Sequence, residues 1–153
     1  MGAIQFIIPL ILFLSSFAVS QIQKNETDFL YNFLSGSYQV IGRLPDSNEL
    51  YDGKIVMERS GDSLNVVRKI AGKEISAVGR IETATADNVK VLRVRFTENN
   101  RTFEITYLIH SDLDNYARLT GYVYLKNGGT KKPGLEALFI DREKIRSEKL
   151  PPK

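Results

Sequence analysis

The chain has 153 residues, a formal charge of +3 and no cysteine. This length suits one domain with one hydrophobic core, and the absence of cysteine excludes disulfides, thiol catalysis and thiolate metal sites. Because the small excess of basic residues does not form a run of Lys or Arg interleaved with aromatic residues, we expect no nucleic acid partner.

The first twenty residues are typical of a secretory signal peptide. The stretch from Ile4 to Phe17 is uncharged and almost entirely apolar, and the small residues Ala18 and Ser20 occupy the positions that a signal peptidase reads. The apolar core is too short to span a bilayer comfortably. We therefore expect residues 1–20 to be cleaved, the protein to be secreted or periplasmic, and no membrane span to remain. The alternative is an uncleaved anchor.

Residues 21–35 are predicted to form a helical segment before the main domain. Four apolar residues recur at helical spacing over Glu26–Leu34 and are expected to share one face: Phe29, Leu30, Phe33 and Leu34. Gly36 ends this pattern.

From residue 36 to residue 140, apolar and polar residues alternate with period two, and turn residues recur at short intervals. The alternation predicts eight strands: Ser37–Arg43, Lys54–Arg59, Ser63–Ile70, Glu74–Glu82, Val89–Thr97, Arg101–His110, Tyr116–Leu125 and Gly134–Ile140. No connection is long enough for a crossover helix, so each strand is expected to pair antiparallel with its sequence neighbours.

Eight such strands predict an all-β, up-and-down barrel, and a two-sheet sandwich is the competing arrangement. Glycines inside the strands, at Gly42, Gly79 and Gly121, favour the barrel because strongly bent strands need residues without side chains. The domain is thus expected to span residues 36–140, and residues 141–153 form a charged tail.

Several short motifs resemble, in their order, the lipocalin and calycin group of barrels. A helical turn precedes Gly36-Ser37-Tyr38, where lipocalins carry tryptophan in the third place. Further motifs are similar to those of small secreted bacterial calycin-like domains: Tyr51-Asp52-Gly53-Lys54-Ile55-Val56-Met57, Gly61-Asp62, Gly79-Arg80-Ile81, Leu119-Thr120-Gly121 and Gly134-Leu135-Glu136-Ala137-Leu138. The resemblance covers roughly residues 38–139 and implies an eight-stranded barrel, but no particular activity.

Arg68 is the leading candidate for ligand binding. It alternates in phase with Leu64, Val66 and Ile70, so it is expected to point into the barrel, where a guanidinium needs an acidic or carbonyl partner. Fatty-acid-binding members of the calycin group use inward arginines to hold a ligand carboxylate. By this analogy Arg68 would anchor an acidic, otherwise apolar ligand, with hydroxyl groups supplied by Tyr38 and Tyr107. The alternatives are an arginine packed over an aromatic ring at the barrel end, or a bulge that turns Arg68 to solvent.

A second candidate site is a surface stripe on one strand. Tyr116, Arg118, Tyr122 and Tyr124 share the face opposite Leu119, and Tyr and Arg are enriched in protein interfaces. The alternative is that aromatic residues simply suit strands.

The remaining polar residues predict no catalytic or metal site. His110 is the only histidine, and its neighbours Ser111 and Asp112 cannot form a triad with it because consecutive residues on a strand point to opposite faces. A single histidine and no cysteine argue against a transition-metal site, and the twelve-residue calcium-loop pattern is missing. We expect no cofactor.

These observations predict an exported, non-catalytic protein that holds a small apolar or acidic ligand in the barrel. The loop Gly42–Asp52 would lie at one barrel mouth as a lid, with Leu44, Leu50 and Tyr51 facing the opening. The alternative is a barrel filled by its own side chains that serves as an extracellular protein-interaction module. A barrel-type isomerase or cyclase is the third possibility.

Overall fold

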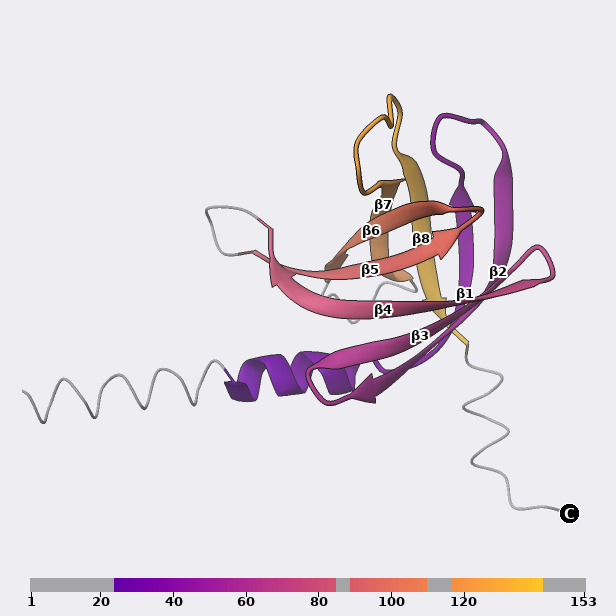
Figure 1. The fold of residues 1–153 in the computed structure, drawn as a ribbon. Helices are drawn as coiled ribbons and strands as arrows, with labels where there is room; N and C mark the ends of the chain where they lie inside the picture. The colour runs from indigo at the N-terminus through magenta and orange to yellow at the C-terminus, as the bar shows by residue number, and fades with distance from the viewer. Residues whose placement is uncertain (1–23, 85–88, 110–116, 142–153) are drawn as a thin grey trace, which may run out of the picture.

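The computed structural model describes residues 24–84, 89–109 and 117–141, and within them one helix precedes eight antiparallel strands that close into a barrel (Figure 1). The helix comprises residues 24–34, and the strands are β1 (Gly36–Arg43), β2 (Leu50–Ser60), β3 (Ser63–Ile70), β4 (Lys73–Thr83), β5 (Lys90–Glu98), β6 (Arg101–Ile109), β7 (Ala117–Leu125) and β8 (Gly134–Ile140). Each strand pairs with its sequence neighbours, and β8 pairs with β1. The predicted up-and-down barrel is confirmed, and the sandwich is excluded. Residues 1–20, which are predicted to be a signal peptide, lie outside the described residues, as do His110, Tyr116 and the tail beyond Asp141.

Strand β2 begins four residues earlier than its apolar pattern predicts. Leu50 and Tyr51 pair with Arg43 and Gly42, so the β1–β2 hairpin encloses a loop of only residues 44–49. The prediction that Leu50 and Tyr51 belong to a lid loop is therefore wrong. This short loop is bound to the β7–β8 connection. The backbone N–H groups of Lys131 and Lys132, which lie in that connection, donate to Oδ1 of Asp46 at 2.9 and 2.7 Å.

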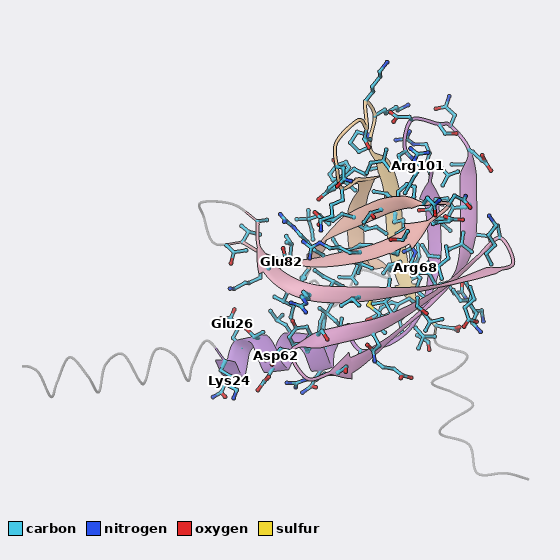
Figure 2. The ribbon with its side chains drawn as sticks, viewed as in Figure 1. Lys24, Glu26, Asp62, Arg68, Glu82 and Arg101 are labelled. Atoms are coloured by element: carbon cyan, nitrogen blue, oxygen red, sulfur yellow. The ribbon has the colours of Figure 1, made fainter. Side chains whose placement is uncertain are left out.

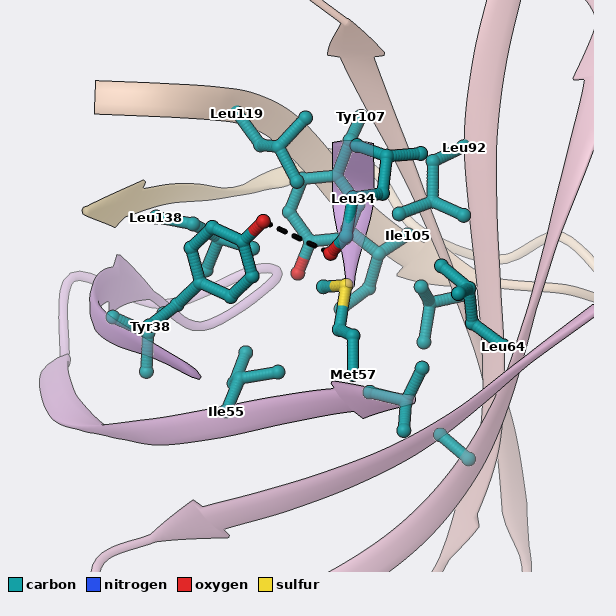
Figure 3. Close-up of a cluster of buried hydrophobic side chains, with 14 of the residues drawn as sticks. Leu34, Tyr38, Ile55, Met57, Leu64, Leu92, Ile105, Tyr107, Leu119 and Leu138 are labelled. Carbon is teal, nitrogen blue, oxygen red and sulfur yellow. Dashed lines mark hydrogen bonds between the residues drawn. The ribbon is translucent and has the colours of Figure 1, made fainter. Parts of the chain in front are cut away.

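The barrel interior holds a continuous cluster of apolar side chains (Figure 3). The largest of those that water does not reach come from the helix and from most of the strands: Tyr107, Leu34, Ile55, Met57, Leu64, Leu92, Ile105, Leu119 and Leu138. Those on strands follow the period-two alternation, since each inward residue is separated from the next by one outward residue. The interior is thus packed chiefly with the chain's own side chains.

The helix covers the end of the barrel where β1 begins. Tyr31 is 2% exposed, and its hydroxyl donates to the carbonyl of Asp62 at 2.7 Å and accepts from the N–H of Ile81 at 3.2 Å. Leu34 is fully buried beside it, whereas Phe29 is 66% exposed. Phe29 stacks on Phe33 with ring centroids 6.2 Å apart, so these two residues share a face of the helix as predicted, but Tyr31 and Leu34 are the helix residues that are buried against the barrel.

Candidate functional site

Arg68 lies on β3 and points into the barrel, as the alternation predicts (Figure 2). Only 3% of the residue is exposed, and the guanidinium lies over the ring of Phe96, with Cζ 4.8 Å from the ring centroid. Phe96 in turn stacks on Phe103, with ring centroids 5.2 Å apart. The aromatic packing foreseen as an alternative is thus present, and the guanidinium remains inside.

The counter-charge of Arg68 is Glu136, an inward residue of β8. Arg68 donates through Nη1 to Oε2 at 3.2 Å and through Nη2 to Oε1. Tyr51 donates to Oε1 at 2.5 Å, and Tyr107 donates to Oε2. Each carboxylate oxygen therefore accepts two hydrogen bonds, which fills its acceptor capacity.

Two glycines make room for this cluster. Gly42 and Gly121 lie on either side of Glu136 in the sheet, and each is paired across the next strand with one of the tyrosines, Gly42 with Tyr51 and Gly121 with Tyr107. A Cβ at Gly42 would lie 2.4 Å from the Tyr51 ring, and one at Gly121 would lie 2.7 Å from the Tyr107 ring. The phenol rings lie over the glycines, and this brings both hydroxyls to Glu136.

Burial and charge act together on the titrating groups of this cluster. Burial, followed by the negative charge of Glu136, raises the pKa of Tyr51 and of Tyr107 well above the usual value for a phenol. Burial opposes the charged form of Arg68, but the facing carboxylate outweighs this effect and raises the pKa of the guanidinium. The tyrosines therefore stay protonated as donors, and the guanidinium of Arg68 stays charged.

The three residues predicted to bind an acidic ligand do not converge. Arg68 and Tyr107 lie together, but Tyr38 donates to the carbonyl of Leu34 at 2.9 Å, beside the helix (Figure 3). The carboxylate expected from a ligand is supplied by Glu136 of the chain itself. Glu136 was missed at the sequence level, although its alternation in phase with Gly134 and Leu138 marks it as inward.

A hollow of about 780 Å³ lies on the outer face of the barrel, over β6, β7, β8, β1 and β2. It is formed by two rows of outward side chains that align across these strands. One row consists of Leu108, Thr120, Ala137, Ile41 and Asp52, and the other of Tyr122, Leu135, Arg43 and Leu50. We call this site the outer hollow.

The outer hollow is concave because small side chains lie between large ones. Thr120 and Ala137 lie at the centre of the first row, flanked by Leu108 and Ile41. Nine large apolar side chains are strongly exposed among the described residues, and five of them line this one site: Leu50 (76%), Tyr122 (56%), Ile41 (55%), Leu135 (44%) and Leu108 (43%). They gather on one face instead of scattering over the surface, and such a patch is typical of a binding site.

The predicted tyrosine stripe is divided between two environments. Tyr122 is exposed and lines the outer hollow, whereas Tyr124 is partly buried and bonds to Glu104 at 2.8 Å and to Thr106 at 2.5 Å. Tyr116 and the side chain of Arg118 lie outside the described part of the chain.

Glu104 belongs to a charged network on the outer face of β4, β5 and β6. Arg95 binds Glu82 with Nη1–Oε1 and Nη2–Oε2 distances of 2.5 and 3.1 Å, and its Nε donates to Glu104 at 2.5 Å. Arg93 binds Glu82 at 3.2 Å. The hydrogen bond from Arg95 lowers the pKa of Glu82. Beside the apolar outer hollow, the sheet surface is therefore held by mutually paired charges.

No family model and no curated protein matches this chain. Within residues 24–84, 89–109 and 117–141, no group of acidic or histidine side chains is arranged to hold a metal ion. The single helix in those ranges is not long and apolar enough to cross a bilayer.

Proposed function

We propose that this chain is an exported, non-catalytic binding protein that takes up an apolar ligand in the outer hollow. The observation that supports this proposal is the cluster of five exposed apolar side chains around a hollow of about 780 Å³. Sites for small molecules usually have volumes of about 300–1,000 Å³, with apolar walls and few polar groups. The polar groups here are few, and Tyr122, Arg43 and Asp52 are the main ones.

The buried cluster supports this location over the barrel interior. A ligand carboxylate at Arg68 would have to displace Glu136, whose four hydrogen bonds are already made. Displacement would leave that carboxylate buried without its counter-charge, which is strongly unfavourable. An interior site for an acidic ligand is therefore not part of the proposal.

The test is titration with a neutral naphthyl dye whose fluorescence rises in apolar surroundings. Ala137→Phe places a ring at the centre of the outer hollow and is expected to weaken dye binding at least about tenfold, a change of about 1.4 kcal/mol. Val78→Phe is the matched control, because Val78 is an exposed outward residue of β4 beyond the hollow. Circular dichroism verifies that both variants are folded.

Equal binding by the wild type and Ala137→Phe would refute the proposed site, as would an equal loss in Val78→Phe. The double variant Arg68→Met, Glu136→Gln adds an independent check on location. It changes two side chains that point into the barrel, so dye bound on the outer face should keep its affinity.

A protein partner is the alternative occupant of the same face, and one observation favours it. Tyr122 is 56% exposed and its hydroxyl has no hydrogen-bond partner among the described residues. Exposed tyrosines beside apolar residues are common in protein interfaces. Failure of the wild type to bind any small apolar probe would favour this alternative.

A further inference from the structure

The outer hollow carries two charged side chains, Arg43 and Asp52, and they are engaged differently. Arg43 donates to the carbonyl of Ser47 at 3.0 Å and to the carbonyl of Pro133 at 3.1 Å, so its guanidinium fastens two loops. Asp52 makes no hydrogen bond or ion pair with the described residues. It is the acidic group of the hollow that is available to a ligand.

The position of Asp52 follows from the register of the sheet. The first row of the hollow runs through Leu108, Thr120, Ala137 and Ile41, and it ends at Asp52 on β2. Four spacings between neighbouring strands give this row a length of roughly 19 Å. An elongated apolar molecule that lies along the row therefore brings one of its ends to a carboxylate.

The other carboxylate that belongs to a lining residue faces away from the hollow. Glu136 contributes to the lining, but its carboxylate is bonded to Arg68 inside the barrel. The hollow thus presents an apolar surface whose β2 end carries a carboxylate without a hydrogen-bond or ion-pair partner among the described residues, while the positive charge of Arg43 in the second row is directed at two backbone carbonyls. A cationic head group complements this arrangement.

We propose that the ligand of the outer hollow is a cationic amphiphile, with an apolar body over Ala137 and an ammonium group at Asp52. This inference rests on the proposed function, which supplies the binding site, and it adds the chemistry of the ligand. It reverses the charge expected from Arg68 alone, since the inward arginine is already neutralised by the chain.

The experiment compares three probes that share a decyl chain and differ in the head group: decylammonium, decanol and decanoate. Each displaces the neutral dye from the full chain at pH 7 and low ionic strength, at concentrations below micelle formation. An exposed ion pair supplies a modest gain, so decylammonium is expected to bind about two- to fivefold more tightly than decanol. The preference should shrink as salt is added, because salt screens exposed charges.

Asp52→Asn is expected to remove the preference for decylammonium and to leave decanol binding unchanged. Glu58→Gln is the matched control, because it removes an exposed carboxylate from the same strand outside the hollow. This variant should retain the wild-type order of affinities.

The outcomes separate the two proposals. If the three probes bind equally, if decanoate binds best, or if Asp52→Asn retains the preference, the cationic ligand is refuted while the apolar site stands. If the wild type binds neither the dye nor any probe, or if Ala137→Phe binds them as the wild type does, the outer hollow is refuted as a binding site for a small apolar ligand.

Discussion

Removing the negative charge of Glu136 should destabilise the protein more than removing any exposed charge. The side chains of Arg68 and Glu136 are only 4% and 0% exposed, so neither charge is solvated by water. Glu136→Gln keeps the shape but leaves the guanidinium uncompensated, and it turns an amide NH₂ group toward hydroxyl donors that need an acceptor. Breaking one partner of a buried pair typically costs about 3–5 kcal/mol.

Urea unfolding followed by circular dichroism measures this loss. With an m-value of about 2 kcal/mol/M, the midpoint should fall by roughly 2 M. Glu74→Gln is the control, because the Lys69–Glu74 pair spans 2.9 Å and both side chains are 60% exposed. Its expected cost is below about 1 kcal/mol.

The double variant Arg68→Met, Glu136→Gln tests the physical cause. It removes the positive charge as well, and neutral replacements of a buried ion pair are often tolerated. We expect the double variant to be more stable than Glu136→Gln alone. A loss below about 1 kcal/mol in the single variant, or no recovery in the double variant, would refute the reasoning that the guanidinium is shielded from water.

Three further predictions concern other contacts of the barrel. Gly121→Ala should cost about 1–3 kcal/mol in urea unfolding, because its Cβ would lie 2.7 Å from a backbone oxygen. Gly79→Ala should cost less, because its Cβ would meet only side chains, at 3.2 Å or more. Tyr31→Phe should cost about 1–2 kcal/mol, since it leaves the N–H of Ile81 without its acceptor, and retention of full stability would contradict the role of this bond. Because folding raises the pKa of Tyr51, this residue contributes fully to the free energy of unfolding below pH 10, the usual phenol pKa, and the contribution is lost as the pH rises further. The free energy of unfolding of Tyr51→Phe should therefore fall less steeply above pH 10 than that of the wild type. Parallel curves of stability against pH for the two proteins would refute the shift.

Period-two alternation predicted the eight strands and most of their limits to within one residue, and the glycines inside the strands favoured a barrel over a sandwich. Ser63–Ile70 and Gly134–Ile140 were predicted with the observed bounds, because turn residues delimit them. β2 was predicted too short, since its first residues include Asp52 and Gly53, which are unfavourable in strands, and pairing with β1 overrides this preference.

The candidate sites were predictable only in part. Alternation placed Arg68 inside, but it could not say that Glu136 lies opposite, because the two residues are 68 positions apart and meet only when the barrel closes. Alternation likewise identifies Ile41 and Leu135 as outward, yet their adjacency depends on the β1–β8 register. Contacts of this kind follow from closure of the sheet and not from any local pattern.

The location of Glu136 on β8 also has a consequence for how the chain folds. Strands β1–β7 can form from neighbouring segments, but the guanidinium of Arg68 has no counter-charge until the final strand arrives. If β8 docks one residue out of register, the carboxylate turns to the outside. A slip of two residues places Gly134 or Leu138 where Glu136 belongs, and the positive charge stays buried alone. The Arg68–Glu136 ion pair therefore favours the native register of β8, because a slip of one or two residues leaves the guanidinium buried without its counter-charge.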